Sequence, residues 1–158
     1  MTATRRADRA ARRLRLELAI QWQVEPSALP RRRTLRRWVA TALERSAEVT
    51  LRFVDAREGR RLNRAYRGSD HATNVLTFVY DGEMSLSGDI VLCAPVVRRE
   101  ARAQGKRLIA HYAHLVIHGM LHLQGYDHQR DDDAARMQAR ESELLATLGY
   151  ADPWRAAR

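Results

Sequence analysis

The chain has 158 residues and a formal net charge of +9, a length typical of one domain with a buried core. Its longest apolar run is too short to span a membrane, and no apolar stretch follows the basic N-terminal residues, so we expect a cytoplasmic, unprocessed protein. The single cysteine, Cys93, excludes an intramolecular disulfide and fits a reducing compartment. We expect a single domain over residues 1–158, with residues 1–13 as a flexible basic tail.

Apolar periodicity predicts the elements of the first half of the chain. Every second residue from Leu14 to Val24 is apolar, which is the period of a strand, and Pro26 ends it. Asp55 is a suitable N-cap for a short helix. The predicted elements are a strand over 14–24, a helix over 34–47, a strand over 49–53 and a short helix over 55–66.

The second half of the chain ends in three predicted helices. Pro95 suits the first turn of a helix, and each of the three helices is followed by a glycine that can stop it. The predicted elements are strands over 74–80 and 88–94, a helix from Pro95 to Gly105, a long apolar helix over 107–124 and a last helix from 131 to Gly149. This order predicts an α+β fold, an α/β-type layered single domain with a small mixed sheet of about four strands and about five helices.

The positive charge is concentrated in the first half. Residues 1–68 hold 18 Lys and Arg against 7 Asp and Glu, whereas residues 69–158 hold 10 against 12. All but one of the basic residues are arginine, whose planar guanidinium suits phosphate groups. The arginine preference alone also fits a GC-rich genome. The asymmetry and the cluster Arg31, Arg32 and Arg33 favour a polyanionic partner.

Four of the six histidines lie within HLVIHGMLHLQGYDH, residues 114–128. His118 and His122 are four residues apart on the predicted long helix, so both rings project from one face. Gly125 can take the left-handed conformation that ends a helix, and the turn brings His128 back toward the pair. Three imidazoles that leave a fourth position open are typical of a catalytic zinc site. We therefore expect one Zn²⁺ per chain, on the long helix and the turn after it.

Polar residues around this motif have roles that the sequence leaves open. His111 and His114 lie on the same helical face as the pair, and we expect them to support the ligands or to pack in the core. Asp127 either orients a ligand or stabilises the turn. The aspartates at 131–133 are expected to cap the last helix and complement its dipole.

The spacing of the three histidines and the glycine matches every ligand position of the metzincin metallopeptidase signature. Those peptidases carry a glutamate, the general base, directly after the first histidine, whereas this chain has Gly119. A zinc peptidase or amidase would therefore need another base, such as Asp89 or Asp127. We interpret Gly119 as space for an anionic phosphodiester, which a glutamate beside the metal would repel.

Several ordered blocks of the chain resemble one bacterial family. The blocks are LNRAYRGSDHATNVLTF (62–78), SGDIVLC (87–93), HGMLHLQGYDH (118–128) and LLATLGYADPW (144–154). Over about residues 48–154 they resemble the YbeY family of single-strand-specific metallo-endoribonucleases, and residues 1–47 contribute little. The usual block TNVLSF has Thr77 in place of serine here, which keeps the hydroxyl.

The resemblance implies a function, a cofactor and partners. It implies rRNA processing, including maturation of the 3′ end of small-subunit (16S) rRNA, and ribosome quality control. It also implies zinc on His118, His122 and His128 and a functional arginine at Arg67. The expected partners are single-stranded RNA, ribosomal RNA and the small ribosomal subunit, with no membrane and no DNA.

Two kinds of alternative remain, for single residues and for the whole protein. Arg67 either stabilises a transition state or forms a salt bridge with Asp70. The rival functions are the zinc peptidase or amidase and a non-catalytic ribosome-binding protein with a structural zinc. The open coordination position argues against a structural zinc, so we predict the nuclease. Its further candidate RNA contacts are Arg31, Arg32, Arg33, Thr73 and Asn74.

Overall fold

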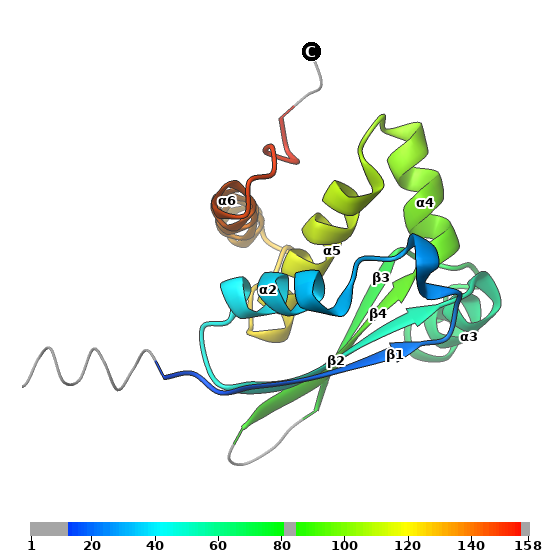
Figure 1. The fold of residues 1–158 in the computed structure, drawn as a ribbon, viewed down its shortest axis with the longest axis horizontal. Helices are drawn as coiled ribbons and strands as arrows, with labels where there is room; N and C mark the ends of the chain where they lie inside the picture. The colour runs from blue at the N-terminus through cyan, green and yellow to red at the C-terminus, as the bar shows by residue number, and fades with distance from the viewer. Residues whose placement is uncertain (1–12, 81–84, 156–158) are drawn as a thin grey trace, which may run out of the picture.

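Figure 1 shows the fold in a computed structural model that describes residues 13–80 and 85–155. The predicted basic tail, residues 1–13, lies outside the described residues except for Arg13. In chain order the elements are β1 (Leu16–Trp22), the 3-10 helix η1 (Pro26–Ala28), α2 (Arg32–Ala42), β2 (Ala47–Val54), α3 (Ala56–Arg67), β3 (Val75–Tyr80), β4 (Leu86–Cys93), α4 (Ala94–Ala103), α5 (Leu108–Leu123) and α6 (Asp131–Thr147).

The four described strands form one mixed sheet in the order β1-β2-β4-β3. Strands β1, β2 and β4 are parallel, and the edge strand β3 runs antiparallel to β4. Together with the five α-helices of the described ranges, this sheet confirms the predicted α+β fold. Within the same ranges, no helix is both long and apolar enough to cross a bilayer.

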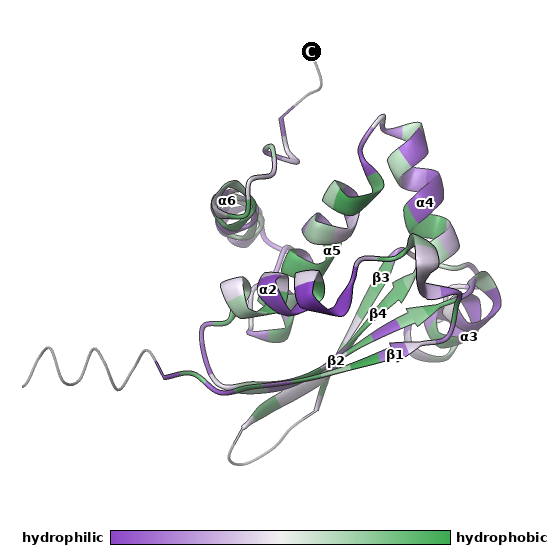
Figure 2. Cartoon of the chain, in the orientation of Figure 1, coloured by the Kyte–Doolittle hydropathy of each residue, from purple (hydrophilic) through white to green (hydrophobic). Residues whose placement is uncertain are grey.

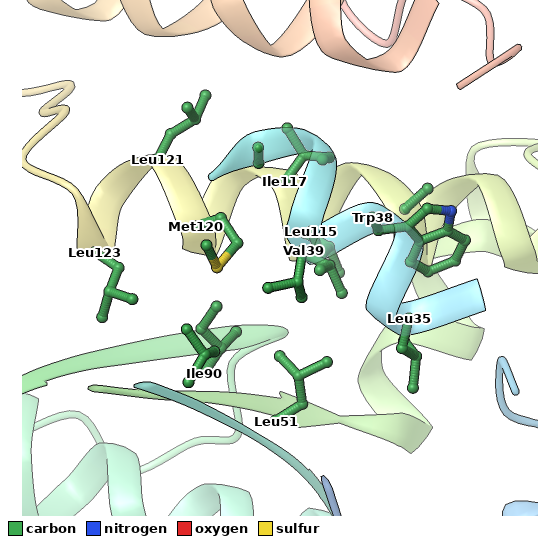
Figure 3. Close-up of a cluster of buried hydrophobic side chains, with 14 of the residues drawn as sticks. Leu35, Trp38, Val39, Leu51, Ile90, Leu115, Ile117, Met120, Leu121 and Leu123 are labelled. Atoms are coloured by element: carbon green, nitrogen blue, oxygen red, sulfur yellow. The ribbon is translucent and has the colours of Figure 1, made fainter. Parts of the chain in front are cut away.

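The sheet buries apolar side chains on both faces, because successive residues of a strand point to opposite sides. On one face, Leu51 of β2 and Ile90 of β4 are fully buried under α2 and α5 (Figure 3). On the other face, Val91 and Cys93 of β4 share an apolar cluster with Leu62 of α3. Helix α5 lies between the sheet and α6, so it is largely apolar, whereas α3 is largely hydrophilic (Figure 2).

Helix α2 differs from its predicted bounds. It begins two residues earlier than expected and ends at Ala42, well before the predicted end at residue 47. The Gln124 side chain ends the helix, since its Oε1 accepts from the Glu44 N–H at 2.6 Å and its Nε2 donates to the Ala42 carbonyl at 2.8 Å. After the helix ends, the chain enters the sheet as β2, which begins at Ala47.

Two capping predictions have different outcomes. Asp55 caps α3 as predicted, because its Oδ1 accepts from the Glu58 N–H at 2.8 Å. The prediction that the aspartates at 131–133 cap α6 was wrong. The N-cap is Arg130, which makes no side-chain capping bond, and the aspartates occupy the first helical turn. Their charges there still favour the positive end of the helix dipole.

Candidate metal centre

Two glycines allow helix α5 to lie close to strand β4. A Cβ atom on Gly119 would lie 2.8 Å from Cγ2 of Ile90, and one on Gly88 would collide with the Leu123 side chain. Larger residues would push the helix off a close-packed sheet. Gly119 therefore faces the sheet, and the interpretation that it leaves space for a phosphodiester was wrong. Its physical role is the close approach of α5 to Ile90.

The turn after α5 is fixed by hydrogen bonds that depend on Gly125. This residue has a φ of 103°, and the N–H groups of Gly125 and Tyr126 donate to the carbonyls of His122 and Leu121 at 3.1 and 3.0 Å. The pair of bonds is a Schellman motif. The Tyr126 hydroxyl also donates to Glu44 Oε1 at 2.8 Å. The turn is thus tied both to its own helix and to the segment after α2.

Asp127 shapes the next part of the turn. Its Oδ1 accepts from the N–H groups of His128 and Gln129 at 2.7 and 3.2 Å, as in an Asx turn. Within the described ranges, no hydrogen bond joins the Asp127 carboxylate to a histidine ring. The aspartate therefore stabilises the turn that presents His128. His128 itself is exposed, so the site opens to solvent on this side.

The turn brings the three predicted ligands together. The ring centroids of His118 and His122 are 6.5 Å apart, and the His128 ring lies 5.7 Å from the first and 5.9 Å from the second. In the described part of the chain, no three His, Cys, Asp or Glu side chains are already arranged as a closed metal-ligand set. Three imidazoles on one tetrahedral zinc would have centroids about 5 Å apart, given Zn–N distances of about 2.0 to 2.1 Å. The three rings are therefore about 1 Å further apart than they would be on one ion, and side-chain movement is needed to bring them onto it.

The hydrogen bonds of the rings determine which nitrogens are free for a metal. His122 Nδ1 lies 3.1 Å from the Tyr126 carbonyl, which can only accept, so this nitrogen carries the proton and Nε2 keeps its lone pair. Burial lowers the pKa of His122, although the Tyr126 carbonyl acts in the opposite direction. The ring is therefore neutral at pH 7. A ligating histidine in proteins typically donates its other N–H in this way, so the residues present fit a zinc ion.

Glu141 of α6 is a site residue that the sequence analysis missed. Its side chain is 1% exposed, and its Oε1 lies 2.7 Å from His118 Nδ1. Burial would raise the pKa of this carboxyl group, but hydrogen bonds with His114 and His118 outweigh burial and lower the pKa to about 2. The available sequence signal was an acidic residue on the apolar stripe of α6, between Met137 and Leu144.

The two other histidines of α5 are in different surroundings. His114 Nε2 lies 2.9 Å from Glu141 Oε2, so it binds the same carboxylate as His118. His111, one turn nearer the start of the helix, places Nε2 3.0 Å from Glu100 Oε1 of α4. Asn74 Nδ2 donates to the same oxygen at 3.0 Å. The candidate RNA contact Asn74 therefore lies in the His111 cluster rather than at the three histidines, and its half-buried neighbour Thr73 precedes it.

Arg67 is the last residue of α3 and is exposed. The helix ends at Gly68, whose φ is 69°. The alternative salt bridge with Asp70 is absent from the described residues, because Asp70 pairs with Arg60, its Oδ1 and Oδ2 lying 2.8 and 2.9 Å from that guanidinium. In the described ranges, no hydrogen bond or ion pair joins Arg67 to the histidine site. Helix α3 lies on the opposite face of the sheet from α5 (Figure 1).

The cluster Arg31–Arg33 lies near the other end of α5. These exposed arginines begin α2, and a hollow beside Pro30 is lined by Leu108, the first residue of α5. His122 lies about 21 Å further along the helix axis, at about 1.5 Å per residue. Arg32 Nη2 also donates to the Leu18 carbonyl at 3.2 Å, which ties the start of α2 to β1.

The two carboxylates considered as peptidase bases are otherwise engaged. Asp89 Oδ2 accepts from the Tyr80 hydroxyl at 2.8 Å. It alternates along β4 with Gly88 and Ile90, which contact α5, so its side chain lies on the opposite face of the sheet. Asp127 is occupied by the turn. Asp89 is therefore not placed to act as a base at the three histidines.

Comparisons with known proteins identify the family. The family model of endoribonuclease YbeY matches residues 22–149. The chain belongs to the endoribonuclease YbeY family. An endoribonuclease YbeY of Nitrosomonas europaea is 57% identical over 139 residues, which cover 88% of this chain and 85% of the relative. An endoribonuclease YbeY of Aromatoleum aromaticum is 54% identical over 151 residues, which cover 94% of this chain and 98% of the relative.

A solved structure is similar as well. The solution structure of a Thermotoga maritima protein has a TM-score of 0.55 and 26% sequence identity, and the match covers 88% of this chain and 99% of that one. The YbeY family match begins at residue 22, so the expectation that residues 1–47 contribute little to the resemblance was wrong for residues 22–47, whereas residues 1–21 lie outside the match. The matched range includes all the predicted site residues and Glu141, whereas Trp154 lies beyond it.

Proposed function

We propose that this protein is a zinc-dependent, single-strand-specific endoribonuclease. Its proposed role is rRNA processing, including 3′-end maturation of small-subunit rRNA, and ribosome quality control. The family and the name of its relatives, endoribonuclease, support nuclease activity. The observation that carries the proposal is the cluster of His118, His122 and His128, in which two rings have Nδ1 hydrogen-bonded and Nε2 free.

The three histidines hold the metal in this proposal. Zinc, when bound, supplies Lewis acidity toward a phosphodiester near neutral pH. The chain's own part is to fix the ring nitrogens through Glu141 and Tyr126 and to leave the side of His128 open for a strand to approach. A flexible single strand can bend into a site with this open side more readily than a duplex can.

Arg67 is the proposed transition-state group. Attack on a phosphodiester increases negative charge on its non-bridging oxygens, and a guanidinium can bind two oxygens in one plane. The exposed side chain of Arg67, with no ion pair in the described residues, is available for this contact. We assign further RNA contacts to Thr73 and Asn74, which lie between Arg67 and β3, and to the cluster Arg31–Arg33.

The proposed partners are single-stranded RNA, ribosomal RNA and the small ribosomal subunit, met in the cytoplasm. The chain's net charge of +9 supports a polyanionic partner. The site offers no groove-reading motif for duplex DNA, so the proposal does not include DNA as a substrate.

The test is cleavage of RNA labelled at its 5′ or 3′ end, with and without a zinc chelator, with the product termini identified. We expect internal cleavage of single-stranded RNA that stops with chelator and returns with added zinc. A duplex of the same sequence serves as the control and should be cut poorly. Chelator-resistant cleavage, or equal cleavage of both substrates, would contradict the proposal.

A further inference from the structure

One buried carboxylate joins three N–H groups from two other parts of the chain. Glu141 Oε1 lies 2.7 Å from His118 Nδ1, and Oε2 lies 2.9 Å from His114 Nε2 and 2.9 Å from Trp154 Nε1. Two donors come from α5, and the third comes from the segment that follows α6. A side chain that is 1% exposed thus links the C-terminal segment to one of the proposed ligands.

The three contacts determine the proton positions on the rings. The Trp154 indole N–H can only donate, so Oε2 acts as an acceptor. A carboxylate offers only acceptors to the remaining contacts, so His118 donates from Nδ1 and His114 donates from Nε2. His118 Nε2 then keeps the lone pair that a metal requires. His114 Nδ1 is buried and has no partner in the described residues.

The C-terminal segment is shaped to reach this carboxylate. Asp152 Oδ1 accepts from the Ser142 hydroxyl at 2.8 Å and from the Trp154 N–H at 2.9 Å, which forms a turn against α6. The indole ring then stands edge-on to the His114 ring, with centroids 5.4 Å apart and planes at 86°. Trp154 is 48% exposed, so packing alone does not explain its position.

We infer that Glu141 is a positioning residue that holds His118 with Nε2 free, and that Trp154 fixes Glu141 in the orientation this requires. The inference rests on the proposed function only in naming zinc as the metal. It extends the centre from a helix and its turn to α6 and the segment after it, so metal affinity depends on a residue outside the family match.

Replacement of Glu141 by glutamine tests this arrangement because an amide has one acceptor oxygen and one donor group. Two donors, from His114 and Trp154, meet at Oε2, so the amide oxygen should face them. The amide NH₂ then faces His118 Nδ1 and forces it to become an acceptor, which moves the ring proton to Nε2. The nitrogen that should bind zinc is then blocked.

The measurement is zinc affinity, by competition with a chromophoric chelator, on the purified full chain. Glu141→Gln should weaken zinc binding roughly 10- to 100-fold, as is usual for the loss of a residue that orients a metal ligand. Glu143→Gln is the matched control, since Glu143 is on the same helix, is exposed and pairs only with Arg140 in the described residues. Equal affinity of wild type, Glu141→Gln and Glu143→Gln would overturn the inference while leaving the proposed function intact.

Trp154→Phe separates the two parts of the inference. Alone it should weaken zinc binding less than Glu141→Gln does. In Glu141→Gln it should partly restore binding, because without the indole N–H the amide can turn its oxygen to His118. Additive losses in the double variant would contradict the assigned role of Trp154, since residues in one hydrogen-bond network should be coupled.

A metal-free readout keeps the test decisive. Nitrogen-15 NMR of the histidine rings should show the proton on His118 Nδ1 in the metal-free wild type and on Nε2 in Glu141→Gln. If wild type binds no zinc, the proposed function fails, and these spectra still decide the role of Glu141. If Glu141→Gln does not fold, the wild-type spectrum and the Trp154→Phe affinity decide it. A wild-type His118 protonated on Nε2 would overturn the inference.

Discussion

Helix α5 holds three histidines against glutamates from neighbouring helices, and the His111 and His118 pairs differ in what lies beyond the ring. Toward the start of the helix, His111 Nε2 meets Glu100 at 3.0 Å, and its Nδ1 is buried without a partner in the described residues. Toward the end, His118 Nδ1 meets Glu141 at 2.7 Å, and its ring lies 5.7 Å from the His128 ring. A His–Glu pair therefore does not by itself indicate a metal ligand. The surroundings of the second nitrogen distinguish the two pairs.

The largest expected effect is on zinc content, which should distinguish the His118 end of α5 from the His111 end. His122→Ala removes one of three ligands and should leave no stably bound zinc and no RNA cleavage, because two imidazoles hold the ion too weakly. His111→Gln should retain about one zinc per chain. The check is zinc content by elemental analysis after dialysis. Full zinc occupancy in His122→Ala would contradict the proposal that zinc binds at the His118 end of α5.

The next effect tests whether cleavage at the proposed zinc site also requires the positive charge of Arg67 from α3. Arg67→Ala should lose about 2 to 4 kcal/mol of transition-state stabilisation, by analogy with the loss of one oxyanion donor, while zinc content and thermal stability stay near wild type. Arg67→Lys should rescue cleavage only in part. Arg64→Ala, on the same helix, is the control for a general loss of charge. Single-turnover cleavage at the wild-type rate in Arg67→Ala would rule out the role.

A smaller effect should come from the arginines beside the start of α5. Replacing Arg31, Arg32 and Arg33 by glutamine should lower the slope of log affinity against log salt by about 2, since each phosphate contact on a single strand contributes about 0.7. Zinc content should not change. The control variant replaces Arg60, Arg61 and Arg140, which are ion-paired, and so loses the same number of positive charges. Equal slopes for the two triple variants, from fluorescence anisotropy with uncleavable RNA, would mean that only net charge matters.

The smallest effect is a pH dependence at the His111 end. Burial lowers the pKa of His111 most strongly, Lys106 and His114 lower it further, and Glu100 opposes them. The unfolded chain therefore binds a proton more readily, so stability is complete above about pH 6.5 and falls as the pH drops below it. His111→Gln should make this fall shallower in metal-free protein. Urea unfolding between pH 5 and 8 measures it, and an identical pH slope would contradict the buried neutral ring.

The sequence was sufficient where the signal is local. Alternating apolar residues located the strands, and the spacing of His118, His122, Gly125 and His128 predicted the cluster, because helical pitch and a left-handed glycine determine where these side chains point. The approach of Gly119 to Ile90 could not be predicted, since it depends on how two elements pack. The early end of α2 likewise depends on packing, because Gln124, which accepts from the Glu44 N–H, lies 80 residues later in the chain.

The hydrogen bonds that orient His118 and His122 could not be predicted from the sequence for a different reason. Every residue has a carbonyl, so nothing in the sequence marks the one at Tyr126 as the acceptor for His122. Glu141 was visible only as a charged residue on an apolar stripe, and its partner His118 lies 23 residues earlier. Such a residue on a helix stripe is the signal to search for, because burial of a carboxylate requires partners.

The position of Trp154 has a consequence for the order in which the site is completed during synthesis. The three proposed ligand histidines are synthesised before Glu141. Trp154, whose indole contacts Glu141, is added 13 residues after Glu141. A nascent chain that stops before α6 has the ligands but nothing to hold the His118 ring. The proposed metal centre therefore reaches its final geometry only after Trp154 has been added, and a chain that stops before α6 should bind zinc more weakly.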